Sequence, residues 1–447
     1  MGVKNFRSWT DAWEKRGWLT RIPKLVDPKY VLGGITRKLG REKAVFFERV
    51  SGYSIPLVTN FIFSRSALAA ALGMEEKDLI PNLRQAMEKP RPCEIVENAP
   101  FQENVLTQNL NPLKMFPFPT YHERDAGPYI TGGVLIAKDP ETGIRNASIH
   151  RVRVFEDDIM SLLILPRHLD LCLQKAAERK QNLEVAVAIG IDPFTLLASQ
   201  AILPFGIDEL EVANAMRGNS SLKLARCATV NLEVPAESEI VLEGVIDPFQ
   251  TRVEGPFGEF PRYYSPQADR PIFRLTAICH RHNPVYYSIL PAGREHLLLG
   301  AIPREVSILM DVQKAVPSVK GVHLTYGGTC RYHLVISMSK KSEGEARVAM
   351  LAAMVNNADI KHVVVVDEDI DIFDMEQVEW AMATRFQGDR GLLMIPNIQV
   401  SNLDPSATAG LGTKVGLDAT APVGGLNELF KPIAIPNCEK IKLEDFL

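Results

Sequence analysis

The stretch Leu183-Glu184-Val185-Ala186-Val187-Ala188-Ile189-Gly190 is a largely apolar run that stops at a glycine. A run of about four to eight such residues, bounded by turn residues, is typical of a buried strand. Similar segments cover Ile130–Ala137, Ala147–Val154, Glu239–Val245 and Phe273–His280. Many short strands with few helices favour a barrel or a sandwich in the middle of the chain.

Helical patterns interrupt and flank this region. Arg167–Arg179 and Glu209–Met216 are expected to be helices within it. Before it, the helical patterns of Ser8–Lys15 and Ser64–Met74, together with the strand-like Ala44–Val50, predict an N-terminal α/β unit.

The stretch from Pro90 to Pro119 is rich in Pro and Asn and lacks periodicity, so we place a domain boundary near residue 110. After Pro303 helical and strand patterns alternate, which predicts a second α/β domain. The expected elements there are helix Arg304–Ala315, strand His333–Ser337, helix Glu343–Asn356, strand His362–Val366 and helix Met375–Thr384. The tail from Ser401 to Gly425 is rich in Gly, Ala, Thr and Pro and is expected to be a loop.

The length of the chain implies several domains. Its 447 residues exceed the number, roughly 250–300, at which single hydrophobic cores stop growing. We predict a multidomain fold of the α+β or α/β class, divided into residues 1–110, 111–300 and 301–447. The first and last parts are α/β, and the middle part is the β-rich one.

The composition excludes several classes of function. Hydrophobic residues make up 46% of the chain and charged residues 23%, and the formal net charge of −4 offers no basic stripe for nucleic acid. The six cysteines form no C-x-x-C pair and the N-terminus has no apolar signal segment, which indicates a reduced, cytoplasmic protein. No apolar run reaches the roughly 18–20 residues that span a membrane. The start Met1-Gly2 could suggest lipidation, but Phe6 departs from that pattern.

The loop Glu254-Gly255-Pro256-Phe257-Gly258-Glu259 holds two carboxylates five positions apart. Glycine and proline prevent a regular helix here, so the turn can direct both side chains to one point. Two carboxylates in a partly dry site repel, and one of them then keeps its proton near neutral pH and can act as a general acid. By spacing alone, a solvated surface turn is the more common explanation.

The segment Asn146–Arg153 alternates like a strand, with Asn146, Ser148 and His150 on one face. Arg151 points to the other face unless a bend intervenes. An arginine on a strand can hold a substrate carboxylate through two parallel hydrogen bonds, although a single arginine there is more often a surface charge.

His168 and Glu209 lie near expected helix starts, where single residues usually cap the helix or face solvent. With Asn146 they would offer one imidazole nitrogen and two oxygens, a mixture that suits a divalent ion such as manganese or magnesium. Their separation in the sequence does not by itself group them.

Three common nucleotide and hydrolase motifs are missing from the sequence. It contains no G-x-G-x-x-G, no G-x-x-x-x-G-K-[ST] and no G-x-S-x-G. The sequence therefore offers no simple argument for a dinucleotide site, a P-loop or a hydrolase nucleophile elbow.

Taken together, these segments resemble the UbiD-type decarboxylases, which use prenylated FMN to remove CO2 from acrylic, aromatic and heteroaromatic acids. The resemblance covers most of the chain and rests on Gly132-Gly133, Ala147–Arg151, Val234–Gly244, Glu254–Glu259 and Thr413–Thr420. It implies an N-terminal α/β piece, a central flavin-binding split β-barrel, and a C-terminal α/β domain whose last segment takes part in oligomerisation.

In that family one arginine and two acidic residues form the catalytic trio, and they match Arg151, Glu254 and Glu259 here. The resemblance makes Glu259 the proton donor. Arg151, paired with Glu254, would orient the substrate carboxylate and the cofactor. These implied roles replace the surface-turn explanation.

The resemblance also implies a set of cofactor contacts. A divalent metal, usually manganese, would bridge the protein to the cofactor phosphate through Asn146, His168 and Glu209. A K+ ion often accompanies them. The residues expected to contact prenylated FMN are Asn146, Ser148, Ile149, His150, Arg151, Arg167, His168, Glu209 and Lys361.

Loss of CO2 from an sp² carbon leaves an unstabilised carbanion, so a cofactor that accepts electrons is required. Pro303 suits the first position of a helix, which would place Arg304 in the first turn. A cation there opposes the helix dipole and needs solvent or an anion to compensate it. If an anion binds, the free N–H groups of the helix start, Arg304 and His296 would together clamp a carboxylate other than the one lost.

Among the branches of the family, the chain looks most like the furan-2,5-dicarboxylate decarboxylases. We therefore expect reversible decarboxylation of furan-2,5-dicarboxylate to 2-furoate. The alternatives are pyrrole-2-carboxylate, a phenolic acid or a polyprenyl-hydroxybenzoate as the substrate, a non-catalytic flavin- or metal-binding protein, and a flavin oxidoreductase. The resemblance further implies a homo-oligomer, from a dimer up to a hexamer, and dependence on a flavin prenyltransferase. Neither nucleic acid nor a membrane is expected as a partner.

Overall fold

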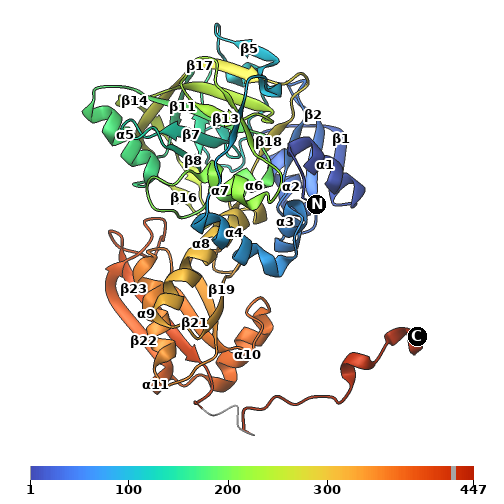
Figure 1. Ribbon diagram of the computed structural model, residues 1–447, viewed down its shortest axis with the longest axis vertical. Helices are drawn as coiled ribbons and strands as arrows, with labels where there is room; N and C mark the ends of the chain where they lie inside the picture. Colours follow the sequence, from blue (N-terminus) through green and yellow to red (C-terminus); the bar gives the residue numbers. More distant parts are fainter. Residues whose placement is uncertain (1, 424–428, 447) are drawn as a thin grey trace. The chain divides into compact units, whose positions relative to one another are not determined.

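The structure, a computed structural model, describes residues 2–423 and 429–446 (Figure 1). One compact unit comprises the residues up to Ser307 with Asn402–Pro405, and a second comprises Ile308–Ser401 and the residues from Ser406 onward. Each unit combines sheets and helices, so the predicted multidomain α/β class is confirmed. Among the described residues, no helix is long and apolar enough to cross a membrane.

The largest sheet of the first unit is a curled, open half-barrel. In the described part of the chain it has nine strands in the order β6-β9-β10-β17-β14-β11-β7-β8, with β5 added beside β17. These strands are β5 Asn104–Leu106, β6 Tyr129–Ile130, β7 Val134–Lys138, β8 Arg145–Ile149, β9 Val152–Val154, β10 Ile159–Leu162, β11 Leu183–Ile189, β14 Ile240–Glu254 and β17 Ala268–His280.

The curl follows from the way the chain crosses from one end of this sheet to the other. Strand β8 is the last in the order and β9 is the second, yet only His150 and Arg151 separate them in the sequence. Two residues span roughly 10 Å at most. The two ends of the sheet therefore approach each other, and Arg151 lies at the seam between them.

Strand β11 shows why the apolar run at Leu183–Ile189 forms the middle of this sheet. Every residue of β11 except Glu184 is buried. The strand is paired on both sides, with β14 and with β7, and helix α5 (His168–Glu178) packs against it and its neighbours (Figure 1). The sequence of a strand that is covered on both faces is a nearly continuous hydrophobic run.

Smaller sheets and helices complete the first unit (Figure 1). The strands are β1 Leu19–Val26, β2 Ala44–Val50, β3 Leu57–Thr59 and β18 Tyr286–Ser288 in one sheet, β4 Glu94–Val96, β12 Lys223–Arg226 and β13 Glu233–Pro235 in another, and the hairpin β15 Phe257–Gly258 with β16 Tyr264–Ser265. The remaining helices are α1 Phe6–Lys15, α2 Val31–Leu39, α3 Arg65–Leu72, α4 Leu79–Glu88, α6 Pro193–Ala198 and α7 Glu209–Met216.

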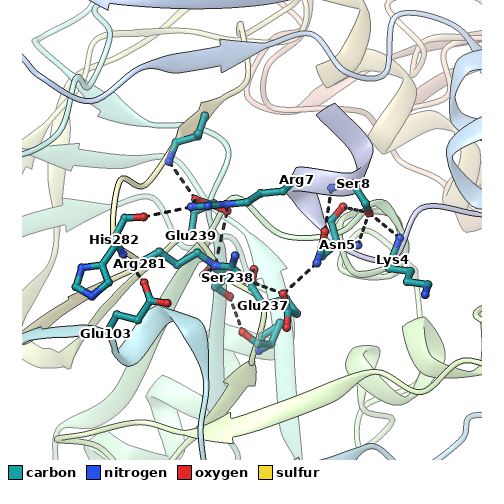
Figure 2. A network of polar contacts seen from close by, with 12 residues as sticks. Lys4, Asn5, Arg7, Ser8, Glu103, Glu237, Ser238, Glu239, Arg281 and His282 are labelled. Atoms are coloured by element: carbon teal, nitrogen blue, oxygen red, sulfur yellow. Dashed lines mark hydrogen bonds and ion pairs between the residues drawn. The ribbon is translucent and has the colours of Figure 1, made fainter. Parts of the chain in front are cut away.

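A network of arginines and carboxylates ties α1 to the beginning of β14 (Figure 2). Figure 2 shows Arg7 reaching from α1 to Glu239, the residue just before β14. Arg7 donates to both oxygens of that fully buried carboxylate, at 2.8 and 3.0 Å. Arg281 donates to Glu237, whose carboxylate also accepts from Asn5. The N-terminal helix is thereby fixed to the half-barrel.

The second unit contains a five-stranded sheet in the order β19-β20-β21-β23-β22. Its elements are β19 Val319–Leu324, β20 His333–Met338, β21 His362–Asp367, β22 Leu392–Gln399, β23 Leu411–Ala419, α9 Glu345–Asn356, α10 Met375–Arg385 and α11 Gly388–Gly391. The predicted loop over Ser401–Gly425 is wrong for β23, which pairs with both β21 and β22. Gly416 explains the error, because a Cβ there would lie 2.2 Å from the Met350 sulfur of α9. A glycine inside a strand can mark a close approach rather than a loop. Part of that stretch, residues 424–425, lies outside the described residues.

The helix predicted to begin after Pro303 begins earlier. Helix α8 covers Arg294–Ala315 and contains Pro303 in its interior, so Arg304 is not in a first turn. An internal proline costs a helix about 3 kcal/mol. The preceding turns bury Leu297, Leu298 and Ile302, and burial of that much apolar surface offsets such a cost. The predicted domain boundary at residue 300 also falls within this helix.

Candidate active site

Arg151, Glu254 and Glu259 meet at the seam of the half-barrel. Arg151 Nη2 donates to Glu254 Oε2 at 2.7 Å, and Arg151 Nη1 donates to Glu259 Oε1. The three side chains are 7%, 0% and 12% exposed, so the ion pairs are almost completely removed from water. Charge pairs in such surroundings are screened far less than surface pairs.

The local backbone explains how one turn presents both acids. Glu254 is the last residue of β14, and Gly255 follows with a φ of +82°, a conformation that favours glycine. The short hairpin of β15 and β16 then places Glu259 directly after Gly258. Arg151 reaches both acids from the link between β8 and β9, which is the bend that frees it from the alternation of the strand.

The guanidinium of Arg151 contacts both acids, which changes the expected electrostatics. The spacing alone predicted two carboxylates that repel each other directly. In the structure each carboxylate instead has Arg151 as a partner. One cation therefore bridges the two acids, and direct repulsion between them is not the feature that distinguishes them.

Three residues that sequence reasoning missed complete the cluster. Tyr129 donates its hydroxyl to Glu254 Oε1 at 2.9 Å, and Ser265 Oγ accepts from Arg151 Nη1 at 2.9 Å. The Phe257 ring lies 5.0 Å from the Arg151 guanidinium, within range of a cation–π contact. The pKa of Tyr129 is raised by burial first and by the charge of Glu254 second, so its proton is available for donation. No spacing rule would have selected Tyr129 or Ser265.

One nitrogen of Arg151 has no partner among the described residues. This nitrogen, Nε, is buried. An unsatisfied buried donor is costly, and such groups usually have a ligand or a water as their partner. The cluster therefore has a donor for an acceptor that a substrate or cofactor would supply.

The three predicted metal ligands also come together. Asn146 Nδ2 donates to Glu209 Oε1 at 3.0 Å, and His168 Nδ1 lies 3.7 Å from the same oxygen. Asn146 and Glu209 are buried, and His168 is partly exposed beside the Phe205 ring. Among the described residues, no group of three His, Cys, Asp or Glu side chains is placed to hold a metal ion, so the amide of Asn146 would have to supply the third ligand here.

Helix starts position this second group. Asp208 is the N-cap of α7 and accepts from the Leu210 amide, which places Glu209 in the first turn. His168 opens α5. Burial raises the pKa of Glu209, and the hydrogen bond from the Ala147 amide works against that rise. A buried carboxylate beside an imidazole and an amide fits a hard to borderline divalent cation.

Ser148 in β8 and His150 directly after it lie between the two groups in the sequence. His150 Nδ1 lies 3.1 Å from the carbonyl of Leu163, which can only accept, so this nitrogen carries the proton. Nε2 then accepts from the Ser148 hydroxyl at 2.9 Å. Burial lowers the pKa of His150 to about 4, and the imidazole therefore stays neutral at physiological pH. Ile149, the last residue of β8, lies between these two and is half-buried.

The remaining predicted residues lie on other elements than the trio. Arg167 is the exposed residue before α5. Lys361 lies in the second unit, where its Nζ donates to Ser406 at 2.6 Å. His296 accepts from the Ala292 amide at the start of α8, and Arg304 donates to the Gly300 carbonyl two turns further along. Their roles toward cofactor and substrate stay predictions.

Models of three successive protein domains match the chain. They are the N-terminal, Rift-related and C-terminal domains of 3-octaprenyl-4-hydroxybenzoate carboxy-lyase (UbiD), and they match residues 10–87, 94–294 and 297–419. Together these matches cover most of the chain.

Curated and solved relatives agree with this match. Anhydromevalonate phosphate decarboxylase of Methanothermobacter thermautotrophicus is 41% identical, over 89% of this chain and 93% of the relative. The UbiD-class enzyme HmfF from Pelotomaculum thermopropionicum, solved with FMN, is 48% identical, covers 99% and 100% of the two chains, and superposes with a TM-score of 0.97. An evolved dimeric form of HmfF was solved with prFMN. The 3,4-dihydroxybenzoic acid decarboxylase of Enterobacter cloacae is 27% identical over the full length of both chains, with a TM-score of 0.92.

Proposed function

The chain belongs to the UbiD family of carboxy-lyases, and we propose that it uses prenylated FMN to convert furan-2,5-dicarboxylate reversibly to 2-furoate and CO2. The observation that carries the proposal is the buried cluster of Arg151 with Glu254 and Glu259. Arg151 holds the carboxylate that leaves, Glu254 keeps Arg151 in place, and Glu259 delivers the proton that replaces CO2.

The cofactor part of the proposal is supported by the solved relatives and by the donors of this chain. HmfF was solved with FMN and with prFMN. When bound, the prenylated flavin would accept the electron pair that the departing CO2 leaves behind. The unpartnered Nε of Arg151 and the partly exposed Ser148 and His150 are the groups of this chain that fit a bound flavin.

Asn146, His168 and Glu209 would hold a divalent ion, and manganese is the proposed metal. Their imidazole, amide and carboxylate donors fit such an ion. Arg167 and Lys361 as further flavin contacts, and a bound K+ ion, are proposed from the family resemblance.

The substrate part of the proposal depends on α8. His296 and Arg304 lie eight residues apart on this helix, which is about 12 Å along its axis. A helix N-terminus therefore cannot contribute beside Arg304, and the proposed clamp for the second carboxylate consists of the two side chains alone. An arginine can hold a carboxylate through two hydrogen bonds. A diacid has a second carboxylate for this contact, whereas a monoacid does not.

A second candidate is a phosphorylated unsaturated acid. Relatives named anhydromevalonate phosphate decarboxylase are 41%, 38% and 35% identical over about nine-tenths of the chain. Basic residues such as His296 and Arg304 bind phosphate as readily as carboxylate. This candidate keeps the trio and its chemistry and changes only the group that the clamp holds.

A substrate panel tests both candidates. The protein is produced together with a flavin prenyltransferase and Mn2+, and CO2 release is measured with furan-2,5-dicarboxylate, pyrrole-2-carboxylate, 3,4-dihydroxybenzoate and a phosphorylated acid. We expect the highest kcat/KM for furan-2,5-dicarboxylate, and preparations that contain only FMN should be inactive. Preference for the phosphorylated acid would replace the first candidate by the second.

Variants of His296 and Arg304 then test whether the clamp binds the second carboxylate. Arg304→Leu and His296→Leu are each expected to raise KM for the diacid at least tenfold, a loss of about 1.4 kcal/mol, because one charged contact disappears. Turnover of a monoacid should change less than twofold. Equal effects on both acids would exclude the clamp.

We also propose a homo-oligomer in which the C-terminal tail takes part. Within residues 429–446, large apolar side chains are exposed, among them Leu429, Ile433, Ile435 and Phe446. Apolar side chains gathered in one exposed segment mark an interaction surface. Light scattering of the full chain and of a chain ending at residue 428 should show a smaller assembly for the shorter one.

A further inference from the structure

Tyr129 contacts the acidic loop through its hydroxyl in two ways. The hydroxyl donates to Glu254 Oε1 at 2.9 Å and accepts from the Gly255 amide at 3.2 Å. The residue is 1% exposed, and its ring packs 4.5 Å from the ring of Phe257. One buried hydroxyl therefore satisfies both a carboxylate oxygen and the first amide of the turn that leads to Glu259.

The pairing of β6 with β9 brings Tyr129 near the link that carries Arg151. Tyr129 begins β6 and is the register partner of Arg153 in β9, the strand that starts directly after Arg151. Tyr129 reaches Oε1 of Glu254 from β6, and Arg151 reaches Oε2 from the link just before β9. The two oxygens of one carboxylate are thus held by two different residues, which fixes the rotation of the carboxylate about its last bond.

The segment before Tyr129 braces the same loop. The Ala126 amide donates to the carbonyl of Pro256 at 2.9 Å, and Asp125 Oδ1 accepts from the Gly258 amide at 2.8 Å. The loop is therefore supported between its two acids, and Tyr129 is the part of this support that touches a catalytic side chain.

We propose that Tyr129 is a positioning residue for the reaction, which holds Glu254 so that its second oxygen stays aligned on Arg151; this rests on the proposed function. Arg151 already uses its other terminal nitrogen for Glu259 and Ser265. If Glu254 turns away, Arg151 loses the anion that fixes its plane, and misplacement of a catalytic group by about 1 Å can reduce turnover about 100-fold.

Tyr129→Phe isolates this role because it keeps the ring and removes only the hydroxyl. The Glu254 oxygen and the Gly255 amide then both lose a partner inside the protein. Tyr286→Phe is the matched control. Tyr286 is a fully buried tyrosine of the same unit, and its hydroxyl has no hydrogen-bond partner among the described residues.

For Tyr129→Phe holoenzyme we expect kcat to fall at least tenfold, with KM within twofold of the wild-type value and an unchanged amount of bound flavin. Tyr286→Phe should match the wild type in these three measurements. A Tyr129→Phe enzyme that also matches the wild type, or that loses flavin and kcat in parallel, overturns the proposal.

A second measurement does not depend on turnover. Urea unfolding midpoints are compared for Tyr129→Phe, Glu254→Gln and the double variant. If Tyr129 acts on Glu254, the double variant should lose less than the sum of the two single losses, whereas strictly additive losses overturn the proposal. Wild-type protein that decarboxylates no acid in the panel would reject the proposed function, and the unfolding comparison would still decide whether Tyr129 holds Glu254.

Discussion

Strand β14 lies between two buried glutamates that arginines hold in different ways. Glu239 precedes the strand and Glu254 ends it, and both are 0% exposed. Glu239 is held by Arg7, a residue whose side chain is 45% exposed, and also accepts from the Val285 amide. Glu254 is held by Arg151, which is almost completely buried.

The two networks differ in whether their buried hydrogen-bonding groups all have a partner. Around Glu239 the carboxylate and both bonded nitrogens of Arg7 are satisfied within the protein (Figure 2). Around Glu254, Arg151 keeps a buried Nε without a partner among the described residues. A network that satisfies itself contributes to stability, and one that keeps a donor available is suited to a ligand. The two ends of one strand therefore combine a structural network with a reactive one.

Glu259→Gln is expected to have the largest effect. A positioned general acid contributes about 100- to 10,000-fold to a rate, so kcat/KM should fall by that order while the amount of bound flavin is kept. The measurement is CO2 release at saturating and limiting substrate. A variant with full turnover would show that Glu259 is not the donor.

Glu239→Gln should show the opposite pattern. Removal of one partner from a buried ion pair costs about 3–5 kcal/mol, and the exposure of Arg7 brings the expected loss to about 2–3 kcal/mol. Urea unfolding measures this loss, and kcat below the unfolding transition should be unchanged. A large loss of kcat without a loss of stability would contradict the division into a structural and a reactive network.

Glu295 extends the comparison to a buried carboxylate held by neutral donors. It accepts from the amides of Asn60 and Ile62 and from the hydroxyl of Tyr287. Burial raises the pKa of Glu295 from 4.5 to about 7. The native state then holds the proton more tightly than the unfolded state does. The stability that this gives is fully present below pH 4.5 and is lost as the pH rises to about 7.

The expected loss across that pH range is up to about 3 kcal/mol, since one pKa unit corresponds to about 1.4 kcal/mol. Glu295→Gln should flatten this part of the pH dependence of the free energy of unfolding. The same pH dependence in wild type and variant would assign it to another group.

Gly190→Ala is expected to have the smallest effect of the four. Gly190 has a φ of +69°, and a Cβ there would lie 2.6 Å from Cγ of Glu239. A left-handed backbone costs a non-glycine residue about 1–2 kcal/mol, and Glu239 must also shift. Thermal unfolding should show this loss. Gly143→Ala is a control for the backbone term alone, because Gly143 has a φ of +72° and nothing within 4 Å of the added Cβ.

Local patterns predicted most of the elements. The helix at Glu209–Met216 has the bounds that the structure gives it, and the strand expected at Leu183–Gly190 ends one residue earlier, at Ile189. The errors arose where packing overrides local preference. Pro303 remains inside a helix because its neighbours are buried, and Gly416 lies in a strand because α9 approaches it closely.

The candidate site was predictable to the extent that its residues belong to motifs. Arg151, Glu254 and Glu259 were found through the family resemblance, whereas spacing alone gave only two acids on a turn. Tyr129 and Ser265 could not be found, because their contacts arise from the pairing of β6 with β9 and of β15 with β16. Such contacts depend on register, which a single sequence does not specify.

The pairing of β14 has a consequence for solvent exchange. From Ile240 to Ile246 the strand is bonded to β11 on one side and β17 on the other, whereas Thr251–Glu254 pairs with β17 within the described residues. The catalytic end is thus a two-stranded ribbon that can open locally, while the other end exchanges its amide hydrogens when the whole sheet unfolds. A ligand held by Arg151 would raise the free energy of that local opening by its binding free energy. The amides of Thr251–Glu254 are therefore the ones whose protection would report that the site is occupied.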